Sequence, residues 1–141
     1  MEAALKHEWT TVVRSYELDM HRHVNNATYL QYLEAARMDF LNSIGFDYSD
    51  FFRKGYSLFV SKIEISYKSP AYLYDLIKVT TETVKKKRFS GTFRQTISRD
   101  QVILADAYVT WACVNKKGKP VPLPDEFNYP EFTPFNQSIP I

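Results

Sequence analysis

The clearest hydrophobic pattern in the chain has a helical period and runs from residue 29 to residue 44. Spacing the residues 100° apart places seven apolar side chains on one face, whereas Gln31 and Asp39 fall opposite. The seven are Tyr29, Leu30, Leu33, Ala36, Phe40, Leu41 and Ile44. Gly45 follows the last of them, where helices commonly end. The pattern predicts an amphipathic helix about 24 Å long, enough to cross a small domain.

The start of this helix is preceded by residues that suit a cap. Asn25, Asn26 or Thr28 can accept a hydrogen bond from a free backbone N–H of the first turn. That turn carries unpaired N–H groups and a partial positive charge. Negative charge, whether present or developing in a reaction, is therefore stabilised at this end.

One cation, Arg37, interrupts the apolar face of the predicted helix. Glu34 lies three residues earlier, at a spacing that lets the two side chains meet. The sequence favours a half-buried ion pair that fixes how the helix sits over a direct contact with a ligand.

The other patterned segments mostly alternate apolar and polar residues, with a period of two, and predict β-strands. These are residues 8–14, 57–68, 76–84, 89–98 and 102–114. The last is nearly all apolar, which predicts a central strand covered on both faces. Residues 46–56 hold five aromatic side chains and predict a connection with a second short helix, whereas 125–141 predicts a tail along the surface.

The order of elements predicts the fold class. Short turns between consecutive strands imply antiparallel neighbours, and the apolar face of the helix must be covered by the sheet. The sequence thus predicts an α+β protein, with a curved antiparallel β-sheet wrapped around one long central α-helix. Residues 1–141 are expected to form a single domain.

Composition narrows the function classes. The net charge of +2 is too small to indicate nucleic-acid binding, and no nucleic-acid partner is predicted. The single cysteine, Cys113, excludes an internal disulfide framework and is expected to be an inert core thiol. The sequence holds no signal-peptide pattern and no stretch of membrane-span length, so a cytoplasmic location is predicted.

Candidate chemistry gathers in the polar loop before the helix. An aspartate, two of the three histidines and two asparagines fall within residues 19–26. A zinc site formed by Asp19, His21 and His23 is a competing interpretation, because a His-x-His pair with a carboxylate is a plausible ligand set. Three ligands within five residues strain that geometry, so no metal and no other cofactor is predicted.

Residues 16–37 resemble the hotdog-fold thioesterases of the 4-hydroxybenzoyl-CoA thioesterase type. The resemblance is carried by Asp19, His23-Val24-Asn25-Asn26, Tyr29-Leu30, and Glu34 with Arg37. Plant acyl-ACP thioesterases look similar too, and match at Asp19-Met20 and His23. Two departures stand out. Arg22 occupies a position where many members have glycine, and His21, which is not the commonest residue at its position, puts a second imidazole near Asp19. In addition, Ser69-Pro70-Ala71 offers no counterpart to a further acidic or cysteine residue of the plant enzymes.

The resemblance implies an acyl thioesterase with the hotdog fold. Asp19 falls on the catalytic aspartate, acting as general base or nucleophile, and the backbone N–H of Asn26 falls where the thioester carbonyl is polarised. His23 is expected to orient the attacking group or to hold the loop. Hotdog thioesterases place the active site between two subunits, so a homodimer or a dimer of dimers is implied.

The same resemblance suggests which residues bind an acyl-CoA or acyl-carrier-protein thioester. The expected substrate-binding residues are His21, Tyr29, Glu34, Tyr67, Lys86, Lys87 and Arg88. The last three belong to a basic turn at 85–88, which suits the phosphates of coenzyme A. The aromatics of 46–56, with Tyr67 and Tyr72, are expected to line the acyl pocket. A hotdog dehydratase and a non-catalytic acyl- or RNA-binding module are the remaining alternatives.

Overall fold

The computed structural model describes residues 6–134. Its helices are α1 (Asn26–Ser43) and the short α2 (Tyr48–Arg53). Its strands are β1 (His7–Val12), β2 (Ser57–Tyr67), β3 (Leu76–Lys86), β4 (Ser90–Arg99) and β5 (Val102–Val114). Single 3₁₀ turns occupy Ser15–Glu17, Asp125–Phe127 and Pro130–Phe132. None of the helices in the described part of the chain is long and apolar enough to cross a membrane.

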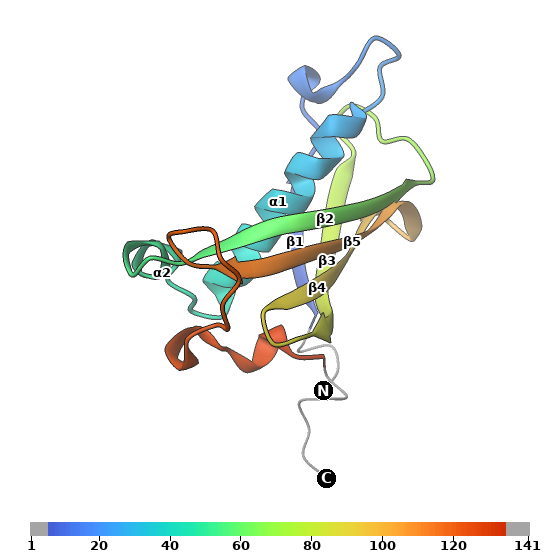
Figure 1. Cartoon of the computed structure of the whole chain (residues 1–141). Helices are drawn as coiled ribbons and strands as arrows, with labels where there is room; N and C mark the ends of the chain where they lie inside the picture. The colour runs from blue at the N-terminus through green and yellow to red at the C-terminus, as the bar shows by residue number, and fades with distance from the viewer. Residues whose placement is uncertain (1–5, 135–141) are drawn as a thin grey trace.

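All five strands pair antiparallel in one sheet, in the order β1-β3-β4-β5-β2. Figure 1 shows the sheet curving around α1, which lies against its concave face. The predicted α+β architecture is confirmed. The strand order leaves β1 and β2 as the two edges of the sheet.

Helix α1 begins three residues before the predicted start. Asn25 is the cap, because its side-chain oxygen accepts a hydrogen bond from the Ala27 N–H at 2.8 Å. Five of the seven predicted apolar residues are buried, but Leu30 is 37% exposed and Ile44 is only half-buried. The sheet covers a face of α1 that also includes Tyr32, and Leu30 lies at the edge of that face.

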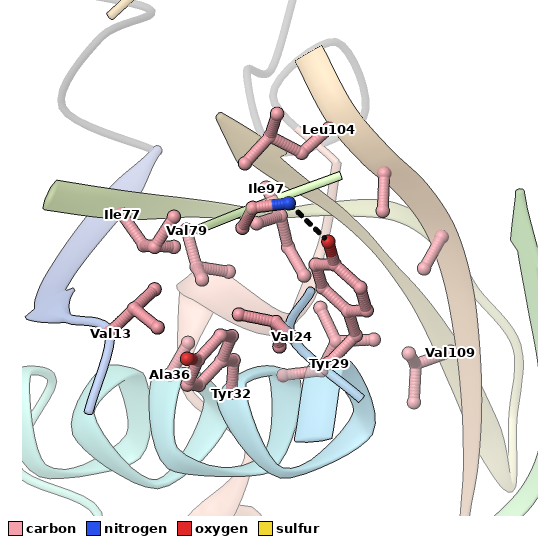
Figure 2. Packing of buried hydrophobic residues seen from close by; sticks show 14 residues of the cluster. Val13, Val24, Tyr29, Tyr32, Ala36, Ile77, Val79, Ile97, Leu104 and Val109 are labelled. Atoms are coloured by element: carbon pink, nitrogen blue, oxygen red, sulfur yellow. Dashed lines mark hydrogen bonds between the residues drawn. The ribbon is translucent and has the colours of Figure 1, made fainter. Parts of the chain in front are cut away.

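Two hydrophobic clusters form the core. The first lies between α1 and the sheet and contains Tyr29, Leu33 and Val79. In Figure 2 the Tyr29 hydroxyl accepts a hydrogen bond from the backbone N–H of Ala71, at 3.1 Å. Burial raises the pKa of Tyr29, which keeps this hydroxyl neutral. The contact ties the segment after β2 to the first turn of α1.

The second cluster is largely aromatic, and it corrects the predicted course of the tail. Phe127 and Phe132 are 4% and 0% exposed and pack against Phe46, so these two side chains of the predicted surface tail belong to the core. The three prolines before them prevent a regular strand or helix, but they do not prevent burial. The last residues of the predicted tail, 135–141, lie outside the described part.

Strand β5 is interior to the sheet but is not covered on both faces, contrary to the prediction. Its residues alternate in burial, and Tyr108 on the convex face is 42% exposed. The single long helix covers only the concave face. Burial raises the pKa of the Cys113 thiol to about 11, as expected of an unreactive core cysteine.

Candidate active site

The loop before α1 is closed by its own backbone. The Asp19 N–H donates to the carbonyl of His23 at 2.8 Å, and the Arg22 N–H donates to the carbonyl of Asp19 at 3.0 Å. Arg22 has a φ of 64°, the left-handed conformation that glycine adopts most easily. Arg22 therefore adopts a glycine-like backbone conformation, and having arginine where many related proteins have glycine does not prevent the loop from closing.

The Asp19 carboxylate is held by the same loop. Its Oδ1 accepts hydrogen bonds from the backbone N–H groups of His21 at 2.9 Å and His23 at 3.2 Å. Partial burial raises the pKa of Asp19, but these two bonds and the nearby imidazoles together outweigh burial and lower it below the ordinary value. Oδ2 accepts no hydrogen bond from residues 6–134 and is the oxygen available to a ligand.

The start of α1 supplies a free donor. Asn25 caps the helix through Ala27, and its carbonyl accepts from the Thr28 N–H at 2.8 Å. The backbone N–H of Asn26 has no acceptor among residues 6–134. The Tyr67 hydroxyl donates to the Asn26 carbonyl at 3.0 Å, which fixes the end of β2 against this turn.

These groups line one open depression of about 320 Å³, here named the Asp19 hollow. Its lining residues are Asp19, His23, Val24, Asn26, Tyr29, Tyr67, Lys68, Ser69 and Pro70. The structure thus brings together five of the candidate site residues, from the loop, the helix start and the end of β2. Sequence reasoning missed Lys68 and Ser69, for which the only signal is that they directly follow Tyr67.

A buried carboxylate, Glu17, anchors the loop from below and was not singled out from the sequence. It is 8% exposed; its Oε1 accepts from the Arg14 N–H at 2.9 Å and from the Tyr32 hydroxyl at 2.7 Å. Its carbonyl accepts from the Asn25 N–H at 2.9 Å. Burial and the bond to Glu17 raise the pKa of Tyr32. Glu17 therefore connects the loop, the cap and the middle of α1.

The basic turn lies far from the Asp19 hollow within one chain. Strand β3 begins beside the loop, where Asp75 accepts the Val13 N–H, and ends at Lys86, so the turn is at the opposite end of the sheet (Figure 1). The Lys86 ammonium lies 6.0 Å from the Trp111 ring, and burial lowers its pKa. Lys87 lines a small depression of about 110 Å³, and the Arg88 guanidinium lies over Phe89.

The two histidines of the loop have different surroundings. The His23 ring packs edge-on against Tyr72, with centroids 5.3 Å apart, whereas His21 is exposed and its ring lies 6.4 Å from that of His23. In residues 6–134 no group of three His, Cys, Asp or Glu side chains is placed to hold a metal ion. Asp19 Oδ1 binds backbone N–H groups instead.

The predicted ion pair between Glu34 and Arg37 is wrong. The Arg37 guanidinium donates to Oε1 of Gln95 at 3.0 Å, and no carboxylate oxygen of residues 6–134 lies within 4.0 Å of it. Burial lowers the pKa of Arg37. Gln95 is fully buried, and its amide donates to the Leu33 carbonyl and to Thr81. The polar Gln95 on an inward-facing strand position was the sequence signal for this partner.

Glu34 and Arg37 line a second depression of about 280 Å³, here named the Arg37 hollow. It is lined by Glu34, Arg37, Met38, Leu41, Tyr48, Leu58, Val60, Phe93 and Trp111. The expected acyl-pocket wall from residues 46–56 is only partly present, because Tyr48 reaches this hollow whereas Phe46 and Phe51 are buried in the core.

The chain is similar in sequence to known thioesterases. A sequence model of the Thioesterase-like superfamily matches residues 13–130. The long-chain acyl-CoA thioesterase FadM of Escherichia coli is 37% identical over 111 residues, covering 74% of this chain and 80% of that protein. The acyl-acyl carrier protein thioesterase ATL3 of Arabidopsis thaliana is 30% identical over 128 residues, covering 84% of this chain and 63% of its own length.

A solved structure extends the comparison to the fold. The probable thioesterase YbaW from Escherichia coli superposes with a TM-score of 0.76 at 35% identity, covering 86% of this chain and 92% of that one. These matches, together with the curved sheet around α1, confirm the predicted hotdog fold. The chain belongs to the thioesterase-like superfamily.

Proposed function

We propose that the protein hydrolyses an acyl-CoA thioester to the free acid and coenzyme A, with Asp19 and the start of α1 as its catalytic groups. One observation carries the proposal. The same hollow is lined by a carboxylate whose Oδ2 accepts no hydrogen bond, and by a helix N-terminal N–H that donates none, among residues 6–134. Membership of the thioesterase-like superfamily supports a thioester hydrolase over the binding-module and dehydratase alternatives.

The chemistry follows from the two groups. Attack on the thioester carbonyl carbon forms a C–O bond and places negative charge on the carbonyl oxygen. The Asn26 N–H, at the positive end of α1, donates to that oxygen. Collapse of the intermediate breaks the C–S bond, and the thiolate leaves without needing a strong general acid.

Asp19 supplies the attack through Oδ2 by one of two routes. As a general base it takes a proton from the water that attacks the carbonyl carbon. As a nucleophile it forms a mixed anhydride when the thiolate leaves, and a water molecule then cleaves this anhydride to release the free acid and restore Asp19. Its lowered pKa keeps it ionised at neutral pH, which both routes require. His23 supports Asp19 through its backbone N–H, and a role for its ring in orienting water stays a prediction.

Acyl-carrier-protein thioesters are the second candidate substrates, favoured by the similarity to ATL3. Turnover of one acyl chain on coenzyme A and on the carrier protein separates the two. The 4-hydroxybenzoyl-CoA type and the roles of His21, Glu34, Lys86, Lys87 and Arg88 in binding stay predictions.

A homodimer is part of the proposal. Strand β2 is an edge of the sheet, and it exposes Phe59, Val60 and Tyr67 by 61%, 37% and 46%. An exposed apolar edge strand of eleven residues is suited to pairing with a second copy. Because the basic turn lies far from Asp19 in one chain, a partner would have to supply it. Light scattering that gives the mass of one chain would refute this arrangement.

The test of the proposal is a thioesterase panel on the wild type and on Asp19→Asn. The substitution keeps the size of the side chain but removes the base and nucleophile, so kcat/KM should fall at least about a hundredfold. Asp100→Asn is the matched control, because Asp100 is an exposed turn residue in a left-handed conformation that asparagine tolerates. Equal rates for wild type and Asp19→Asn would remove Asp19 from the chemistry.

A further inference from the structure

The Arg37 hollow has the size and walls of a site for part of an apolar ligand. Its volume, about 280 Å³, lies just below the range of whole small-molecule sites. Met38 and Leu41 of α1 face Leu58 and Val60 of β2 across it. Such a hollow suits the end of a longer molecule whose other end lies elsewhere.

The Asp19 hollow marks where the other end would lie. Strand β2 runs along α1 in the opposite direction, since Tyr67 bonds to Asn26 and Leu58 lies by Leu41 (Figure 1). At about 1.5 Å per residue, Arg37 lies roughly 16 Å along the helix from Asn26. An extended hydrocarbon gains roughly 1.3 Å per carbon, from a C–C bond of about 1.5 Å. A thioester at Asn26 therefore reaches Arg37 with about 12 carbons.

Arg37 limits which chemical group the second hollow can bind. Of its five N–H donors, only one, on Nη1, has an acceptor among residues 6–134, the Gln95 oxygen. Gln95 cannot turn to offer more, because its amide is fixed by Leu33 and Thr81. A largely buried guanidinium with unused donors is costly, and an aliphatic tail would cover it without relief.

Glu34, the second polar side chain of the Arg37 hollow, limits which chemical group of a ligand can bind beside Arg37. Glu34 offers a carboxylate on the rim of the same hollow. A hydroxyl can accept from Arg37 and donate to Glu34 at the same time. A terminal carboxylate can only accept, and its attraction to Arg37 is opposed by repulsion from Glu34. We propose that the Arg37 hollow binds the far end of an acyl chain of about 12 carbons, and that Arg37 and Glu34 hydrogen-bond a hydroxyl group there. This inference rests on the proposed function for the position of the thioester.

The test compares ω-hydroxydodecanoyl-CoA with dodecanoyl-CoA and with the ω-carboxy analogue. The wild type should prefer the hydroxy substrate about tenfold or more in kcat/KM, as a hydrogen bond to a charged group provides. Arg37→Met should bring that ratio to about one, whereas the matched control Arg53→Met, at an arginine 71% exposed on α2, should keep it. A ratio unchanged by Arg37→Met, or a preference for the ω-carboxy substrate, would overturn the inference.

Two further measurements keep the outcome clear. If Arg37→Met does not fold, Met38→Trp fills the hollow from α1 and should lower the ratio of dodecanoyl-CoA to hexanoyl-CoA turnover about tenfold or more. An unchanged ratio would contradict the placement of the acyl tail.

Calorimetric binding of free ω-hydroxydodecanoate and dodecanoate tests the site without requiring hydrolysis. The protein could bind the hydroxy acid more tightly, lose that preference in Arg37→Met, and yet show no thioesterase activity. That result would refute the proposed function but support the proposed site.

Discussion

The contact between Tyr32 and Glu17 gives the sharpest stability prediction. The Tyr32 hydroxyl is buried and donates to a buried carboxylate at 2.7 Å. Tyr32→Phe removes this donor and leaves the carboxylate with the bonds from Arg14. A hydrogen bond to a charged group contributes about 1.5–3 kcal/mol, so the free energy of unfolding should fall by about 2 kcal/mol. For a chain of this length the melting temperature should fall by roughly 6 °C.

Urea unfolding followed by tryptophan fluorescence at neutral pH measures this loss. Tyr74→Phe is the matched control, because Tyr74 is 76% exposed and should change stability by less than about 0.5 kcal/mol. A loss for Tyr32→Phe as small as that of the control would show that Glu17 does not depend on this donor. The reasoning that Glu17 fixes the loop to α1 would then be refuted.

The same residue sets a pH dependence. Burial and the bond to Glu17 raise the folded-state pKa of Tyr32 above its ordinary value of 10.0. The contribution to stability is therefore complete below the unfolded pKa and is lost as the pH rises above it. Wild type should lose stability more steeply than Tyr32→Phe in alkaline solution, and parallel curves would contradict the raised pKa.

Two predictions concern the loop. Arg22→Gly should raise the free energy of unfolding by about 0.5–1 kcal/mol in thermal melts. The left-handed backbone destabilises the folded state with arginine by more than glycine's greater unfolded-state entropy destabilises the variant. A loss of stability would show that the arginine side chain has a stabilising contact. Because its pKa is lowered, Asp19 should stay ionised, and kcat/KM should not fall from about pH 8 to about pH 5. A midpoint between those values would assign the activity to a different group.

The fold was predictable because its signals are local and periodic. The spacing from Tyr29 to Leu41 determines the buried face of α1, and strand alternation predicts the three short connections that join β2, β3, β4 and β5. The course of the tail was not predictable from a local pattern, since the burial of Phe127 and Phe132 depends on a gap left beside Phe46 by distant segments. The exposed convex face of β5 likewise depends on how many helices cover the sheet.

The candidate site was likewise predictable only where its residues lie close together in the sequence. Asp19, His23 and Asn26 are close in sequence, and a family resemblance indicated them together. Arg37 was assigned the wrong partner, because spacing along one helix favours Glu34, while Gln95 comes from a strand 58 residues away. Glu17 gave no signal at all, since its burial arises only when the loop folds back over Tyr32.

The backbone of the loop of residues 19–23 also determines which of its side chains can be substituted without moving Asp19. Its closing contacts use main-chain atoms only, apart from the aspartate itself. The side chains of Met20 and His21 are exposed and form no hydrogen bond within residues 6–134. Substitutions at these two positions, in natural or laboratory evolution, should therefore leave the Asp19 carboxylate where it is.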